Sequence, residues 1–154
     1  MREILFRAKR IDDSEWVEGY YAMMGKENLI RHYIVQNCAL TGLFEDPEDN
    51  MYFNDVEIDP ETLCQYTGLT DKNGNRIWEN DIVDASEEWW SACGPAGHNS
   101  PIIKVEWLEG LTGFEPFANY DCDCGVYIDA SGCEVIGNIF DNPELLKGEQ
   151  GCRN

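Results

Sequence analysis

The residue types best suited to chemistry in this 154-residue chain are its seven cysteines and two histidines. Cys122 and Cys124 are separated by one residue, so both thiols would lie on the same face of a strand. A closed structural zinc site takes four ligands, and its paired cysteines are usually separated by two to four residues. The shorter spacing therefore favours reduced, metal-free cysteines that pack as small hydrophobic side chains. A chelate that draws on Cys93, His98 or Cys152 is the alternative interpretation.

Cys93 and His98 would also provide the thiol and the base of a nucleophilic enzyme. Such a pair needs a third group to orient the histidine, and the sequence identifies none. Residues 71–75 are similar to the start of a calcium loop, but that loop needs Gly at its sixth position and Glu at its twelfth, where this chain has Arg76 and Ile82. We therefore expect no catalytic residue, no bound metal, no cofactor and no enzyme activity. A small metal- or thiol-dependent enzyme is the weaker alternative.

The charge of the chain restricts its partners. It contains 30 acidic and 11 basic residues, for a net charge of −19 that is spread along the chain. This charge opposes binding to a nucleic-acid backbone and docking on anionic lipid. No apolar run approaches the roughly 20 residues of a membrane helix, and the chain begins with no secretory leader. We expect a cytoplasmic protein that binds neither nucleic acid directly nor membrane.

The elements that would position these residues are strands, because apolar residues alternate with a period of two and no long helical period occurs. Asn73–Gly74 predicts a tight hairpin turn between two such runs. Asp59 followed by Pro60 predicts a capped helical turn, and residues 142–148 carry the signals of a short terminal helix. The predicted strands comprise residues 3–8, 15–21, 32–36, 65–69, 76–83, 103–107, 122–129 and 133–139. The predicted class is mainly β.

Three blocks of the sequence resemble the YopX-like proteins of phages and prophages. These blocks are residues 2–8 with Trp16-Val17, residues 65–83 (QYTGLTDKNGNRIWENDIV), and residues 134–146 (EVIGNIFDNPELL), in family order. The resemblance implies a mostly β fold with an SH3-like barrel in the C-terminal part. It also implies a phage or prophage gene product of unassigned biochemical activity, so no catalytic residues are carried over. We expect an N-terminal β-hairpin subdomain over 1–59, the barrel over 60–147 and a tail over 148–154.

The chain departs from the family pattern at Asn80, where members usually have Gly. Asn is the non-glycine residue that best tolerates a left-handed backbone, so we expect a bent or bulged strand at this position. Residues 85–101 match no pattern of the family, so we expect them to form a loop insertion.

Two features suggest recognition of a partner. Trp89 and Trp90 lie in the polar insertion loop, and Trp is enriched among residues that dominate binding; alternatively, one or both fold back over the barrel. On a strand, Asp55, Glu57 and Asp59 would share one face with a repeat of about 6.6 Å, close to the spacing of phosphates along one DNA strand. The alternative without a binding role is a solvated acidic surface that keeps the protein soluble.

We therefore predict a non-enzymatic accessory protein that binds a protein partner in the cytoplasm of a bacterial host. The first alternative is an acidic mimic of nucleic acid that inhibits a basic, DNA-binding host protein. The predicted partner-binding residues are Trp89, Trp90, Asp55, Glu57 and Asp59. A homo-oligomer is also compatible with the sequence.

Overall fold

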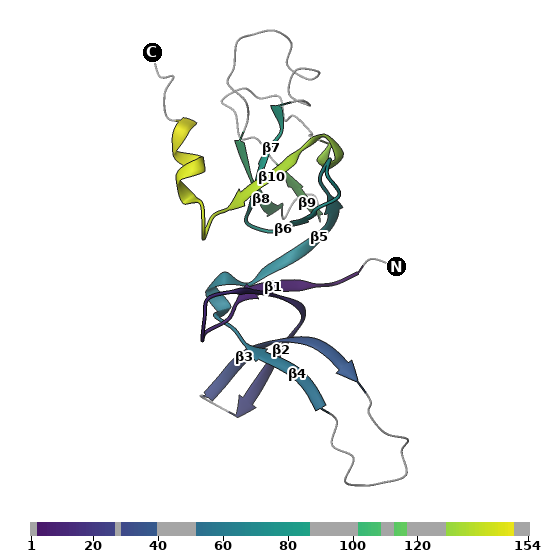
Figure 1. Cartoon of the computed structure of the whole chain (residues 1–154), viewed down its shortest axis with the longest axis vertical. Helices are drawn as coiled ribbons and strands as arrows, with labels where there is room; N and C mark the ends of the chain where they lie inside the picture. Colours follow the sequence, from purple (N-terminus) through teal and green to yellow (C-terminus); the bar gives the residue numbers. More distant parts are fainter. Residues whose placement is uncertain are drawn as a thin grey trace. The chain divides into compact units, whose positions relative to one another are not determined.

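The computed structural model describes residues 3–26, 29–39, 52–86, 102–108, 113–116 and 129–149 (Figure 1). The chain divides into two compact units, one from Met1 to Gln65 and the other from Tyr66 to Asn154. Antiparallel strands joined by turns and short 3-10 helices make up the described residues. The predicted mainly β class is therefore confirmed. Within the described part of the chain, no helix is long and apolar enough to cross a membrane.

Antiparallel strands lie side by side in the order β4-β3-β2-β1-β5; the first four belong to the first unit, and β5 begins in it and continues into the second. Their bounds are Phe6–Lys9 for β1, Trp16–Lys26 for β2, Leu29–Ala39 for β3, Tyr52–Glu57 for β4 and Cys64–Thr70 for β5. The predicted opening hairpin is confirmed, since β1 and β2 pair from Phe6↔Gly19 to Lys9↔Trp16. The third predicted strand, which contains His32, lies within β3. The second predicted strand is longer than expected, because β2 continues to Lys26.

A small hydrophobic core supports this sheet. Ala8, Val17, Ile34 and Ile58 are buried and contact one another. Ala8 lies directly opposite Val17 in the β1–β2 register, and Ile34 lies on the same face of the neighbouring strand. Alternate residues of a strand point to opposite faces, so the period-two pattern of the sequence is sufficient to place these side chains together.

The predicted helical turn after residue 58 is also confirmed. Asp59 Oδ1 accepts the Glu61 N–H at 3.0 Å, and Pro60 begins the 3-10 helix η1 (Pro60–Thr62). Proline suits this position because its φ is already helical and its missing N–H would have no partner in the helix. Thr62 Oγ1 accepts the Lys9 N–H at 2.8 Å, which ties η1 to β1.

In the second unit, a four-stranded antiparallel sheet has the order β10-β7-β8-β9, and β5 pairs with β6. The elements are β6 (Arg76–Trp78), β7 (Asp81–Asp84), β8 (Ile102–Leu108), β9 (Gly113–Pro116), η2 (Ala130–Gly132), β10 (Glu134–Asn138) and η3 (Pro143–Glu149). Gly74, between β5 and β6, has φ +83°, which confirms the predicted turn at Asn73–Gly74. The predicted terminal helix is the 3-10 helix η3. No closed barrel forms among the described strands, so the SH3-like barrel stays a prediction.

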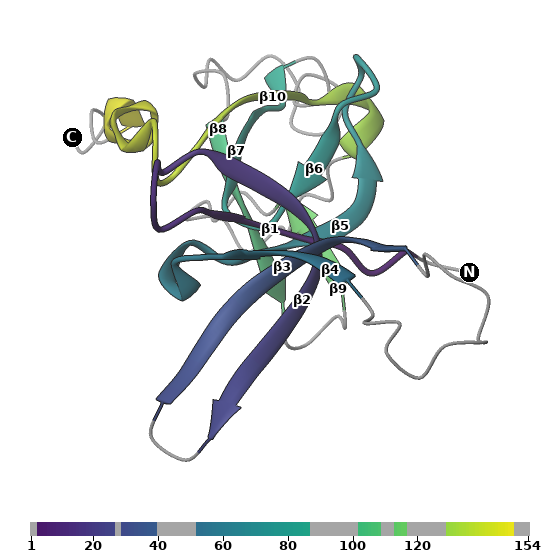
Figure 2. The ribbon, with the colours of Figure 1, turned by 60° about the horizontal axis from the view of Figure 1, so that its bottom comes forward.

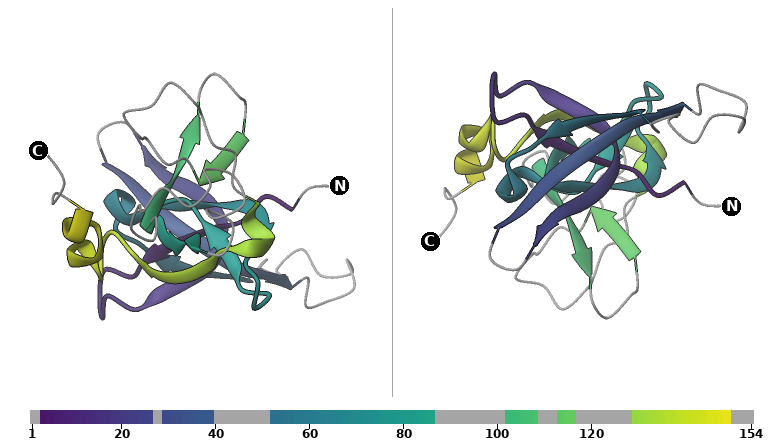
Figure 3. Two further views of the ribbon diagram at one scale, coloured as in Figure 1. Left: turned by 90° about the horizontal axis from the view of Figure 1, so that it is seen from above. Right: turned by 90° about the horizontal axis from the view of Figure 1, so that it is seen from below.

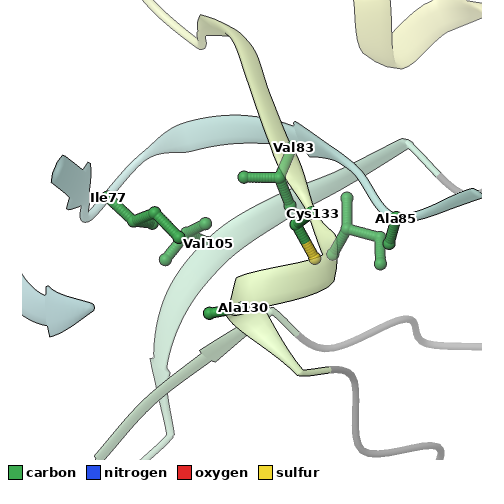
Figure 4. Packing of buried hydrophobic residues seen from close by; sticks show 7 residues of the cluster. Ile77, Val83, Ala85, Val105, Ala130 and Cys133 are labelled. Atoms are coloured by element: carbon green, nitrogen blue, oxygen red, sulfur yellow. The ribbon is translucent and has the colours of Figure 1, made fainter. Parts of the chain in front are cut away.

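The core of the second unit gathers side chains from β6, β7, β8, η2 and the residues next to them (Figure 4). Val83 on β7 lies opposite Ile103 on β8, and both are buried. Cys133, between η2 and β10, is fully buried in the same cluster. The complete cluster comprises Ile77, Val83, Ala85, Ile103, Val105, Ala130 and Cys133.

Candidate protein-binding surface

The β2–β3 hairpin extends well beyond the strands that flank it. β2 and β3 pair continuously from Tyr20↔Val35 to Lys26↔Leu29. β1 pairs with β2 only as far as Gly19, and the β3–β4 pairing begins at Tyr33. We call residues 20–26 and 29–32 the hairpin arm. Its outer part, residues 23–26 and 29–32, is a two-stranded ribbon, whereas residues 20–22 pair with the part of β3 that β4 also flanks. Figure 2 and Figure 3 show β2 and β3 running together as this ribbon.

Large apolar side chains are exposed along the hairpin arm. Met23 is 63% exposed, Leu29 67% and Ile30 55%; Tyr20 and Met24 are exposed as well. Register places Met23 and Ile30 on one face of the ribbon and the other three on the opposite face. Natural proteins usually place charges or proline on exposed strands, because apolar edges attract other chains. Apolar residues on both faces of a projecting ribbon therefore mark an interaction surface.

The hairpin arm also lies in the part of the chain that carries no net charge. Residues 1–39 contain six acidic and six basic residues, whereas the remainder contains 24 acidic and five basic residues. Within the arm the charged residues are Lys26 and Arg31, and Arg31 Nη1 lies 3.3 Å from Glu57 Oε2. A partner that approaches the arm thus meets less like-charge repulsion than it would elsewhere.

The base of the arm is held by aromatic contacts and a side-chain hydrogen bond. Tyr21 Oη and His32 Nδ1 share a hydrogen bond of 2.6 Å across the two strands. The two rings stack at 5.9 Å with an interplanar angle of 17°, and the Phe6 ring lies 5.7 Å from Tyr21. These contacts fix the direction of the arm where it leaves the core.

Two glycines are needed for the path of the hairpin. Gly25 has φ +148°, and a Cβ at this residue would lie 1.9 Å from the Leu29 carbonyl oxygen. At Gly19, where β2 leaves β1, a Cβ would lie 2.4 Å from the Val35 carbonyl oxygen. Only a residue without a side chain fits such close backbone approaches. Sequence reasoning missed one signal for this surface: the apolar and aromatic run YYAMM, residues 20–24, stands between two glycines.

The acidic residues predicted to bind a partner have different local roles. Asp55 is exposed on β4, whereas Glu57 on the same strand forms the ion pair with Arg31. Asp59 lies beyond the end of β4, and its carboxylate caps η1. Trp89 and Trp90 lie outside the described residues. Partner binding by these five residues stays a prediction.

Most of the residues considered above for metal binding or nucleophilic chemistry lie outside the described part of the chain. They are Cys93, His98, Cys122, Cys124 and Cys152. Of the cysteines whose side chains are described, Cys64 and Cys133 are buried. Each thiol donates to a backbone carbonyl, Cys64 to Thr62 at 3.3 Å and Cys133 to Asp129 at 3.4 Å. The described residues contain no group of three or more side chains placed to hold a metal ion.

Asp71, in the block that carries the family resemblance, is a buried hydrogen-bond acceptor. Its Oδ1 accepts the backbone N–H groups of Asn73 at 2.9 Å and Asn75 at 2.8 Å. Its Oδ2 accepts the Asn75 side-chain amide and the Val135 N–H, both at 3.1 Å. Burial by itself would raise the pKa of Asp71, but these hydrogen bonds together outweigh it and hold the pKa below its usual value. The carboxylate therefore joins the β5–β6 turn to β10.

The next residues of that block hold a second turn. Asn80 adopts φ +66°, which confirms the bend predicted at this position. Its N–H donates to the Val105 carbonyl at 2.9 Å, and its carbonyl accepts the Ile139 N–H at 3.0 Å. Asp81, 1% exposed, accepts the Trp78 N–H at 2.8 Å. Asn80 and Asp81 thus hold the turn between β6 and β7 and connect it to the backbone at Val105 and Ile139.

Together these features define an all-β protein of two units, in which the most distinctive sequence block stabilises turns. The family model described as YopX protein matches residues 5–147. The chain belongs to the YopX family. A crystal structure of protein EF1440 from Enterococcus faecalis is similar at 22% sequence identity, over 95% of this chain and 99% of that chain, with a TM-score of 0.44. No curated protein matches the sequence.

Proposed function

We propose that this YopX-family chain is a non-enzymatic accessory protein of phage or prophage origin. It acts in the cytoplasm of the bacterial host by binding another protein through the hairpin arm. The observation that carries the proposal is the exposure of Tyr20, Met23, Met24, Leu29 and Ile30 on one projecting ribbon. Tyr and Met are enriched at protein interfaces, and a rigid base lowers the entropy cost of ordering the surface.

Acidic mimicry of nucleic acid has less support. Two of the three carboxylates that would imitate phosphates already have partners within the chain. Glu57 forms an ion pair with Arg31, and Asp59 accepts the Glu61 N–H. Asp55, the third carboxylate, is exposed on β4. The two functions also differ in their salt dependence, since screening weakens attraction between opposite charges but leaves apolar contacts in place.

The experiment compares proteins captured from a host lysate by three full-length chains. The chains are the wild type, the double variant Met23→Ser/Leu29→Ser, and Ile11→Ser. Ile11 is 60% exposed and lies outside the arm, so it is the matched control for removing an exposed apolar side chain. We expect capture by the wild type and by Ile11→Ser, a loss of at least tenfold with the double variant, and persistence at high salt.

Two results would contradict the proposal. Capture that is equal for all three chains would exclude the arm as the binding surface. Capture of a basic protein that is released by salt and by duplex DNA, and lost on Asp55→Asn, would instead support nucleic-acid mimicry.

A further inference from the structure

We propose that the occupant of the hairpin arm is a second copy of this chain, with the two β2 strands paired antiparallel along residues 20–26. This inference rests on the proposed function, because it uses the same hairpin arm; the second copy pairs with the edge of β2, and the apolar faces of the arm remain for another protein. Three observations carry it: an unpaired strand edge, a self-complementary order of side chains, and the charge of the arm.

The first observation is the outer edge of β2. β3 pairs with one edge of β2 along the whole arm, and β1 pairs with the other edge only over residues 16–19. Residues 3–5, which precede β1, are described and are not in a strand. Among the described residues, the edge from Tyr20 to Lys26 thus has no strand beside it. At 3.3 Å per residue it is about 23 Å long, which is enough for a complete strand pairing.

The second observation is the order of side chains along this edge. A two-fold axis at Met23 would place Met23 opposite Met23 of the second copy. It would place Tyr21 opposite Gly25 of the second copy, where the missing side chain leaves room for the ring. Ala22 would meet Met24, and Tyr20 would meet Lys26, whose aliphatic stem and ammonium both suit an aromatic face. Every cross-strand pair is then apolar or cation–aromatic, which is the kind that stabilises a sheet.

The third observation is the charge. The segment from Tyr20 to Lys26 contains no acidic residue, whereas the whole chain carries a net charge of −19. Two copies therefore repel each other over most of their surfaces, whereas the paired edge itself brings no acidic side chain against another. It follows that added salt strengthens this dimer, because it screens the repulsion and leaves the apolar contact intact.

The test measures the mass of the full chain by analytical ultracentrifugation over a range of protein and salt concentrations. The monomer mass is 17.6 kDa, so the dimer has twice this value. The variants are Met23→Lys and Met23→Glu, each alone and in an equimolar mixture. Met23 is 63% exposed, so neither change buries a charge in the folded monomer. Ile11→Lys is the matched control, since Ile11 is 60% exposed outside the arm.

We expect the wild type and Ile11→Lys to dimerise, and to do so more strongly as salt rises. Each Met23 variant alone should weaken the dimer at least tenfold, because like charges then meet at the two-fold axis. The mixture should restore the dimer, since Lys then faces Glu. A merely unfolded variant would not be rescued in this way.

Three results would overturn the inference. They are a wild type that stays monomeric at every salt concentration, a dimer that neither Met23 variant weakens, and a mixture that is no better than either variant alone. If the wild type is monomeric while the double variant Met23→Ser/Leu29→Ser still loses capture from lysate, the arm binds a different protein and the proposed function stands. If the dimer forms as expected but lysate capture does not depend on the arm, the binding of other proteins fails and the self-association stands.

Discussion

Replacing Asp71 with asparagine tests whether the most distinctive block of the sequence acts through one buried carboxylate. The substitution preserves the size of the side chain and one oxygen. That oxygen can still accept the N–H groups of Asn73 and Asn75, which lie 2.9 and 2.8 Å from Oδ1. The new amide nitrogen, however, replaces Oδ2, which accepts the Val135 N–H and the Asn75 side-chain amide.

The expected loss follows from these four contacts. A hydrogen bond to a charged group contributes about 1.5–3 kcal/mol, and a buried donor that loses its acceptor costs about 1–3 kcal/mol. The Asn75 amide can rotate to present its oxygen, but the Val135 N–H has no such adjustment. We therefore expect Asp71→Asn to lower the free energy of unfolding of the second unit by about 3 kcal/mol at neutral pH.

The effect should also depend on pH in a definite direction. The pKa of Asp71 is lower in the folded protein than in the unfolded chain, where it is about 3.9. Its contribution to stability is thus complete above that value and is lost as the pH falls through the folded pKa. The difference in stability between wild type and Asp71→Asn should stay constant from neutral pH to about pH 5 and shrink below about pH 4.

Urea denaturation at several pH values measures this difference, and hydrogen exchange of the Val135 N–H reports the local effect. Asp129→Asn is the matched control. Asp129 accepts one backbone N–H, that of Ser131 at 2.9 Å, as the N-cap of η2, and Asn caps a helix about as well as Asp. A loss below about 0.5 kcal/mol for Asp71→Asn, or a loss equal to that of the control, would refute the assigned role.

Three further substitutions test single features of the fold, each by urea denaturation. Gly74→Ala should cost about 1–2 kcal/mol from left-handed strain alone, since no atom lies within 4 Å of the added Cβ; unchanged stability would contradict the turn assignment. Asn80→Val should be about 1–2 kcal/mol less stable than Asn80→Gly, because φ is +66° and valine is β-branched; equal stabilities would mean that the backbone does not need this conformation. Tyr21→Phe should cost about 1 kcal/mol by removing the bond to His32 while keeping both ring contacts, and a neutral result would show that this hydrogen bond does not stabilise the base of the arm.

Local patterns in the sequence were sufficient for much of the secondary structure. The alternation of Phe6 and Ala8 predicted β1, and the order Asp59-Pro60 predicted a capped helical turn. Gly74 and Asn80 marked two of the three positions of left-handed backbone in the family block; the third is Gly68, with φ +83°. These features depend on neighbours within a few residues, so the chain itself encodes them.

The role of Asp71 could not be predicted in the same way. Its three local hydrogen bonds come from residues two and four positions away, but the fourth comes from Val135, 64 residues later. A polar residue in a turn-forming segment is normally exposed to solvent. The carboxylate is buried because β10 packs beside the β5–β6 turn in the folded protein, and there it accepts the Val135 N–H.

The candidate binding surface shows the same division. The sequence by itself determined that residues 15–21 and 32–36 favour strands and that the first 39 residues carry no net charge. It did not determine which apolar residues of these strands become core. Tertiary structure decided this, because the β1–β2 pairing ends at Gly19 and the β3–β4 pairing begins at Tyr33. Ile34 is therefore buried, whereas Ile30, four residues earlier on the same face of the same strand, lies beyond the reach of the core and is exposed.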